Sequence, residues 1–140
     1  MCCTLTVAQE YRRKTTSVSL INYHFVWCPR YCRQVLGGPV KVRLETLVRE
    51  TLAELDCEAL ALEVMADHVH LFANCPPTLA PCEIIFRVKG RSSRVLRQEF
   101  PNLRRLPSLW TRSYFVATAG NVSADTTRHY IEAQNRREQA

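Results

Sequence analysis

Hydrophobic and polar positions along this chain alternate with two different periods, and these periods predict its secondary structure. Apolar, β-branched and aromatic residues are dense over 18–28, which predicts a long strand that ends at Pro29. Over 40–55, apolar residues recur every three or four positions, and Pro39 stands where a helix can begin. Strict alternation over 60–65 predicts a second strand. The first half is therefore predicted to run strand, helix, strand.

The second half contains a further strand, a helix and another strand. Residues 68–75 predict a third strand, joined to the second by a tight turn at Ala66-Asp67. A helix is expected over 79–99, followed by a fourth strand over 110–118. A turn at Gly120-Asn121 then leads into a last helix. These elements complete the order β-α-β-β-α-β with one helix added at the C-terminus.

This order predicts an α+β fold of the ferredoxin-like kind, a four-stranded antiparallel sheet with both helices on one face. In that plan the first and third strands are adjacent at the centre, so the third strand would lie beside His24 of the first. His24 could then orient a ligand or the DNA, or serve as a structural histidine with its hydrogen bonds satisfied. The length predicts a single domain over 1–140, with residues 1 to about 16 as a flexible N-terminal segment.

Positive charge is concentrated in one stretch of the chain. The sequence holds 19 Lys and Arg against 13 Asp and Glu, a net charge of +6. Residues 87–105 contain seven basic residues and one acidic residue, which equals the whole excess. Solvated helix faces usually mix both signs, so this concentration indicates a polyanion such as nucleic acid. Small residues between the cations, such as Gly90, suit either a sugar–phosphate backbone or tight helix packing.

Seven cysteines show neither zinc-site spacing nor the even count of a disulfide framework. Cys28 and Cys32 lack a second pair, and the first residues carry no secretion-signal pattern. No apolar run approaches the length of a membrane span. We therefore expect reduced thiols in a cytoplasmic protein that has no membrane partner.

The candidate chemistry begins with Asp67-His68-Val69-His70. On a strand, His68 and His70 share one face while Val69 points to the other, which suits a core. Neutral imidazoles bind divalent metals, and two of them leave most of the coordination sphere open, as a catalytic metal needs. Two histidines on a partly solvated strand would give the same pattern.

A second candidate lies near the C-terminus. Tyr130 and Gln134 are four residues apart, so they share one face of a helix. A tyrosine can act as a covalent nucleophile, and a glutamine carbonyl can ligate a metal. An amphipathic helix with an incidental tyrosine is the alternative. Earlier in the chain, the basic loop with Arg30, Tyr31 and Arg33 suits phosphate and base contacts or simply a solvated loop.

Together, several motifs resemble one family, the single-tyrosine HUH transposases of bacterial and archaeal single-strand insertion sequences, of the TnpA type. The resemblance runs from about 17 to 137. One departure is Ala66, where the family usually has proline. The motifs that carry the resemblance are Asn22-Tyr23-His24-Phe25-Val26-Trp27, Glu63-Val64-Met65-Ala66-Asp67-His68-Val69-His70-Leu71, Lys89-Gly90-Arg91-Ser92-Ser93, Leu109-Trp110-Thr111-Arg112-Ser113-Tyr114-Phe115, Ala119-Gly120-Asn121-Val122-Ser123 and Tyr130-Ile131-Glu132-Ala133-Gln134.

The resemblance implies a role for each candidate. Tyr130 matches the nucleophile, and His68, His70 and Gln134 match the ligands of Mg²⁺ or Mn²⁺. The implied substrate is single-stranded DNA at the ends of an insertion sequence, recognised through nearby hairpins. The implied assembly is a homodimer in which the tyrosine helix of one subunit completes the histidine site of the other. The implied location is the cytoplasm of a bacterial or archaeal cell, at the nucleoid when bound to DNA.

Contacts to DNA are expected from the basic loop, the basic helix and the segment before the last strand. Trp110 and Tyr114 could stack on unpaired bases or belong to the core. The alternatives are a non-catalytic single-stranded nucleic-acid-binding module, a domesticated relative that processes repeated chromosomal hairpins, and an inactive copy. The candidate DNA-binding residues are Arg30, Tyr31, Arg33, Lys89, Arg91, Ser92, Arg94 and Arg112.

Overall fold

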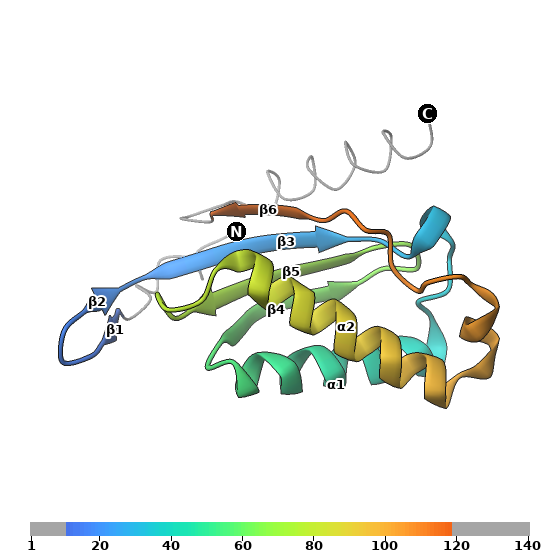
Figure 1. Cartoon of the computed structure of the whole chain (residues 1–140), viewed down its shortest axis with the longest axis horizontal. Coiled ribbons are helices and arrows are strands. Elements are labelled where there is room, and N and C mark those ends of the chain that lie inside the picture. The colour runs from blue at the N-terminus through green and yellow to red at the C-terminus, as the bar shows by residue number, and fades with distance from the viewer. Residues whose placement is uncertain (1–10, 119–140) are drawn as a thin grey trace, which may run out of the picture.

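A four-stranded antiparallel sheet and two helices packed on it form the two layers of this protein (Figure 1). The computed structural model describes residues 11–118. The strands follow the order β4-β5-β3-β6, and β1 and β2 form a separate two-stranded ribbon. The elements are β1 (Arg12–Arg13), β2 (Val18–Ser19), β3 (Ile21–Trp27), η2 (Arg30–Cys32), α1 (Gly38–Glu54), β4 (Glu58–Val64), β5 (Val69–Cys75), α2 (Pro81–Glu99), η3 (Pro101–Arg105) and β6 (Phe115–Thr118).

The register of the two central strands sorts their side chains onto two faces. Phe25 pairs with Leu71, and both side chains are fully buried in the core beneath the helices. Alternation sends their neighbours to the opposite face, where Val26 pairs with His70. One face of the sheet is therefore a dry core, and the other carries the histidines.

The core lies between the sheet and both helices, which lie on the same side of it (Figure 1). Helix α1 contributes Leu44 and Leu47, and α2 contributes Ile84, Val88 and Leu96, all of which are almost completely buried. These positions repeat at helical spacing, as the sequence predicted. The predicted ferredoxin-like plan, with the first and third predicted strands adjacent at the centre, is confirmed.

The N-terminal part differs from the expectation. The first long strand, predicted over 18–28, is divided: β3 covers Ile21–Trp27, while Val18–Ser19 pairs with Arg12–Arg13. Arg12–Arg13 thus forms a short strand inside the segment, residues 1 to about 16, whose flexibility stays a prediction. Arg12 explains the order, because its guanidinium donates to Asn74 Oδ1 at 2.7 Å and to Asp56 at 3.3 Å.

The last strand is shorter than predicted. The sequence indicated a strand over 110–118, whereas β6 covers only Phe115–Thr118. Trp110 lies in the core instead, 5 % exposed, and its backbone forms an isolated bridge with Pro29. The carbonyls of Thr111 and Ser113 accept hydrogen bonds from Lys89, at 2.6 and 3.1 Å, so they face α2 and leave the sheet ladder.

Within the described part of the chain, Cys57, Cys75 and Cys82 are free thiols. None of the helices within residues 11–118 is long and apolar enough to span a bilayer. The added terminal helix, with Tyr130 and Gln134, and the turn at Gly120-Asn121 lie outside the described residues.

Candidate active site

The turn between β4 and β5 positions the first histidine. Met65 N–H donates to the carbonyl of His68 at 2.8 Å, which closes the tight two-residue turn that the sequence predicted. Leu36 N–H donates to the carbonyl of Ala66 at 3.1 Å and ties this turn to the loop after β3. His68 therefore lies just before β5, which begins at Val69, and not within the strand as predicted.

His70 lies inside β5 and contacts His24 of the adjacent strand. His24 Nε2 and His70 Nδ1 form a hydrogen bond at 2.6 Å. The His24 ring also stacks on Phe72, with centroids 5.2 Å apart, and meets Phe115 edge-on at 5.8 Å. Both histidines are buried, at 3 % and 5 % exposure. His24 is thus a buried histidine with a hydrogen bond made, as its structural role predicts, and it stands where it can also orient His70.

The hydrogen bonds leave one nitrogen of each candidate ligand for a metal. His68 Nδ1–H donates to Asp67 Oδ1 at 2.8 Å, so its Nε2 keeps a lone pair. When His70 Nδ1–H donates to His24, its Nε2 is likewise left with a lone pair. A carboxylate or second base behind a ligating imidazole fixes its tautomer and orientation. Asp67 and His24 stand in that position.

Burial keeps the central pair neutral. Burial, and then the charge of neighbouring His70, lowers the pKa of His24 from 6.5 to about 4. Burial, and then His68, lowers the pKa of His70 to about 4 in the same way. A neutral imidazole is the form that binds a metal, so at neutral pH no proton has to leave His70 before it can serve as a ligand.

Two imidazoles make an incomplete metal site by themselves. Over residues 11–118, no group of three His, Cys, Asp or Glu side chains is arranged to hold a metal ion. A third ligand of one of these four residue types would therefore have to come from outside residues 11–118 or from another molecule. The sequence named Gln134 for this role and Tyr130 as its reactive neighbour, and both lie outside the described residues.

Two of the predicted DNA-binding residues on α2 are engaged in internal contacts. Besides its bonds to the 111–113 segment, Lys89 is half-buried, and this burial lowers its pKa. Ser92 is 1 % exposed; its hydroxyl donates to the carbonyl of Val88 at 2.6 Å and accepts from Trp110 Nε1 at 3.0 Å. A phosphate contact by Ser92 would require these bonds to break.

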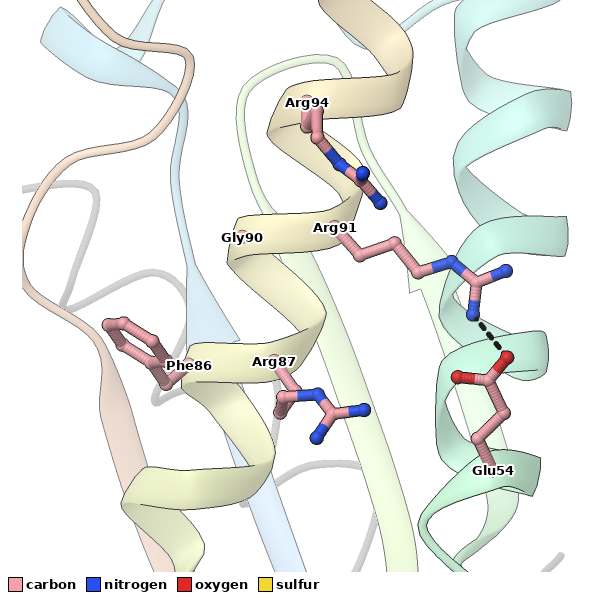
Figure 2. A pocket seen from close by; sticks show the side chains of 6 residues that line it. All are labelled: Glu54, Phe86, Arg87, Gly90, Arg91 and Arg94. Carbon is pink, nitrogen blue, oxygen red and sulfur yellow. Dashed lines mark ion pairs between the residues drawn. The ribbon is translucent and has the colours of Figure 1, made fainter.

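The outer face of α2 has a hollow lined by three arginines together with Glu54, Phe86 and Gly90 (Figure 2). The hollow has a volume of about 430 Å³. Arg87, Arg91 and Arg94 extend from α2 to the same side, whereas Phe86 points the other way and is 78 % exposed. A Cβ on Gly90 would meet nothing within 4 Å, so this glycine leaves open space and does not serve tight helix packing. We call Arg87, Gly90, Arg91 and Arg94 the basic face of α2.

The cations of the basic face differ in availability. Arg91 pairs with Glu54 at 2.9 Å and with Glu50 at 3.3 Å, so its charge is already compensated. No hydrogen bond or ion pair inside the 11–118 range engages Arg87 or Arg94. Arg94 was named individually from the sequence as a candidate DNA contact, whereas Arg87 was counted only as part of the basic segment.

The remaining predicted DNA contacts lie in two loops. Arg30, Tyr31 and Arg33 occupy the turn after β3, with Tyr31 66 % exposed. Arg112 is exposed in the segment before β6. Of the two further aromatic candidates, Trp110 is core, which excludes stacking on a base, and Tyr114 is 38 % exposed with Lys89 Nζ at 5.9 Å from its ring centroid.

The comparisons with known proteins decide the family. The model of the family described as "Transposase IS200 like" matches residues 17–134. This chain belongs to the IS200-like transposase family. It is 32 % identical over 132 residues to the ISDra2 transposase TnpA of Deinococcus radiodurans, covering 92 % of this chain and 94 % of that protein.

Further relatives extend the comparison. The transposase for insertion sequence element IS200 of Salmonella typhimurium is 30 % identical over 124 residues, covering 84 % of this chain and 82 % of that one. A crystal structure of a candidate transposase from Deinococcus radiodurans R1 superposes with a TM-score of 0.78 at 31 % identity, covering 88 % and 97 %. A REP-associated tyrosine transposase bound to a REP hairpin shares the fold alone, with a TM-score of 0.53 at 16 % identity over 89 % and 69 %.

Asp67 is the residue of this family member's histidine site that sequence reasoning missed. It stands directly before the first histidine, and an acidic neighbour of a candidate ligand is a recognisable signal for a supporting residue. Arg87 could have been found from its three-residue spacing to Gly90 and its four-residue spacing to Arg91, which place all three on one side of a helix.

Proposed function

We propose that this transposase cleaves and rejoins single-stranded DNA at the ends of an insertion sequence, with Tyr130 as the nucleophile. His68, His70 and Gln134 would hold Mg²⁺ or Mn²⁺, and two subunits would form composite sites. The single observation that carries this proposal is the pair of buried imidazoles, each fixed at Nδ1 by a partner and each able to offer Nε2. Membership of a transposase family supports the reaction class.

The reaction needs one attacking group and one leaving group on a phosphate. The phenol oxygen of Tyr130 attacks the phosphorus, the phenolic proton departs, and the DNA 3′-oxygen leaves as a hydroxyl. The 5′ side then remains on the tyrosine as a phosphotyrosine. A 3′-hydroxyl from another DNA end attacks that phosphotyrosine and releases the phenol. Each step exchanges one phosphodiester for another, so no external energy source is required.

The donor set of the histidine site fits a divalent cation. A bound cation would offset the negative charge that develops on the phosphate oxygens. Imidazole nitrogen suits Mn²⁺ better than Mg²⁺, which prefers oxygen ligands, so we expect tighter binding of Mn²⁺ at this pair. Asp67 and His24 hold the two rings in place, and burial keeps His70 neutral.

The basic face of α2 supplies candidate contacts for the DNA backbone. Arg87 and Arg94, the two uncompensated guanidiniums beside open space at Gly90, are suited to phosphate oxygens. Arg112 is exposed and offers a further cation. Recognition of hairpins near the element ends belongs to the proposal too. The REP-associated tyrosine transposase, which shares the fold, was solved with a REP hairpin bound.

The deciding experiment looks for a covalent adduct. The protein is incubated with single-stranded DNA from the sequences that flank its coding region, with Mg²⁺, Mn²⁺ or EDTA, and resolved by denaturing electrophoresis. We expect an adduct with either cation, none with EDTA and none with Tyr130→Phe. Tyr11→Phe serves as the matched control, because it removes the hydroxyl of another exposed tyrosine. Its neighbour Arg12 bonds Asn74, at the end of β5 away from His70.

The same assay separates the alternatives. A non-catalytic binding module would retain the DNA without forming an adduct under any condition. A domesticated relative would form the adduct on repeated chromosomal hairpins and not on DNA beside its own coding region, and an inactive copy would fail with both. Mixing His70→Ala with Tyr130→Phe tests the dimer: composite sites predict that the mixture regains activity that neither variant has alone.

A further inference from the structure

The turn after β3 has an unusual backbone at its exposed aromatic residue. Tyr31 has a φ of 60° and Cys32 a φ of 51°, so two consecutive residues with a Cβ adopt the left-handed conformation. Each such residue costs roughly 1 kcal/mol or more relative to an ordinary conformation. The result is that the Tyr31 side chain is turned outward, with 66 % of its surface exposed.

Two arginines hold the exposed ring. The guanidinium carbons of Arg30 and Arg33 lie 5.3 and 5.9 Å from the Tyr31 ring centroid, within cation–π range. Arg30 is itself anchored, because its Nη1 donates to Ser108 Oγ at 3.0 Å and its backbone N–H donates to the carbonyl of Leu109 at 2.8 Å. The exposed phenol ring thus has two positive charges beside it, one of which is fixed in place by its hydrogen bonds.

This turn lies at the end of the sheet that carries the histidine site. Trp27, the last residue of β3, pairs with Val69, the residue between the two candidate ligands. The hydrogen bond from Leu36 N–H to the carbonyl of Ala66 joins the far side of the same loop to the β4–β5 turn. Figure 1 shows η2 and the β4–β5 connection at the same end of the molecule.

We propose that Tyr31 stacks one unpaired base of the DNA strand that passes the histidine pair, while Arg30 and Arg33 hold the flanking phosphates. We call Arg30, Tyr31 and Arg33 the stacking turn. An exposed aromatic ring with an arginine before it and another after it in the chain matches a base that has a phosphate on either side. In a duplex the faces of internal bases are covered by their neighbours, so the occupant is a single strand. The position of the DNA strand beside the histidine pair rests on the proposed function, whereas the stacking itself does not.

The stacking is tested with a single-stranded oligothymidylate of about 12 nucleotides that carries one 2-aminopurine. We expect Tyr31→Phe to keep the fluorescence quenching and the affinity, and Tyr31→Asn to lose the quenching and to bind about 5- to 150-fold more weakly. Asparagine tolerates the left-handed backbone, so this variant removes the ring without straining the turn. Tyr11→Asn, at a similarly exposed tyrosine remote from the turn, should bind like the wild type.

The position of the base is tested by abasic substitution along the strand that the protein cleaves. An abasic site next to the cleaved phosphate should weaken binding as much as Tyr31→Asn does, and the two changes together should cost little more than either alone. Fully additive effects at every position near the cleaved phosphate would overturn the assignment. Unchanged quenching in Tyr31→Asn would overturn the stacking.

The two proposals can fail separately. If the wild-type protein forms no adduct but Tyr31→Asn loses oligothymidylate quenching, the stacking turn stands and the nuclease chemistry falls. If the adduct forms and Tyr31→Asn makes it as fast as the wild type with unchanged affinity, the chemistry stands and the stacking turn falls.

Discussion

The histidine site and the basic face of α2 show two ways in which a candidate functional region can be built. At the histidine site, strand register and a tight turn fix the backbone, and every ring has a partner that orients it. On the basic face, long side chains project from one helix, and their roles differ from one position to the next. His70 is 5 % exposed, whereas Arg87 and Arg94 are exposed.

The difference teaches how far a residue's type predicts its role. A buried histidine pair such as His24 and His70 is informative about a site, because few arrangements bury imidazoles with their hydrogen bonds satisfied. A run of cations is not, because arginine and lysine also serve as structural donors. Lys89 holds the segment before β6, and Arg91 forms ion pairs with two glutamates of α1. Counting charges alone therefore overestimates the number of cations available to a phosphate, and the hydrogen bonds and ion pairs of each cation correct that number.

The largest effect should come from His70. We expect His70→Ala to lower the rate of adduct formation at a fixed, subsaturating Mn²⁺ concentration by at least about 100-fold, because it removes a proposed metal ligand and not only the support of one. Excess Mn²⁺ should restore part of the rate. Arg94→Ala should lower it less than about tenfold, since one phosphate contact of several is lost. Equal losses in the two variants would remove the distinction between the two regions.

The second effect is on the stability of the metal-free protein. Because the pKa values of His24 and His70 are about 4 in the folded protein and 6.5 when unperturbed, the unfolded chain binds protons first as pH falls. The free energy of unfolding should therefore be highest above pH 6.5. It should fall between pH 6.5 and 4 by on the order of 1–3 kcal/mol. Urea unfolding in EDTA at several pH values measures it.

His24→Phe serves as the control for this pH dependence. Phenylalanine fills the same site beside Phe72 and Phe115 without a titrating group. The slope of stability against pH should become shallower in this variant. An unchanged slope would mean that other groups cause the loss, and that the histidine pair is not the acid-sensitive part of the fold.

A smaller effect is expected from the free cations of α2. Removing one phosphate contact to single-stranded DNA should reduce the slope of log affinity against log salt by about 0.7. We expect this change in Arg87→Ala and in Arg94→Ala. Arg91→Ala should leave a slope closer to that of the wild type, because Glu50 and Glu54 already compensate its charge. Identical slopes in all three variants would contradict the division into a paired Arg91 and an available Arg87 and Arg94.

The smallest effect concerns Gly90. Since a Cβ at this helix position meets nothing, Gly90→Ala should raise the free energy of unfolding by about 0.5–1 kcal/mol. The same methyl group would stand in the space through which a DNA backbone approaches, so affinity for single-stranded DNA should fall a few-fold. A stabilised variant with unchanged affinity would place the DNA away from this part of α2.

The element order could be predicted from the sequence because periodicity is a local property. The helices at Gly38–Glu54 and Pro81–Glu99 and the tight turn at Ala66-Asp67 follow the predictions closely. The ends of the first and last strands did not, because distant partners set them. Arg12 reaches Asn74 and draws the N-terminal segment into a ribbon, and Lys89 holds the residues before Phe115 away from the sheet.

The sequence by itself determined the fold plan, the family motifs and the identity of the two imidazoles, since these depend on spacing along the chain. Only the tertiary structure decided which groups stand behind them. The bond between His24 and His70 joins residues 46 positions apart, and it exists because two strands pair in one register. The same holds for the cations of α2, whose availability depends on acidic residues and carbonyls from other elements. Hydrogen bonds and ion pairs between distant segments produce no periodic pattern of residues along the chain, so they can be read only from the three-dimensional structure.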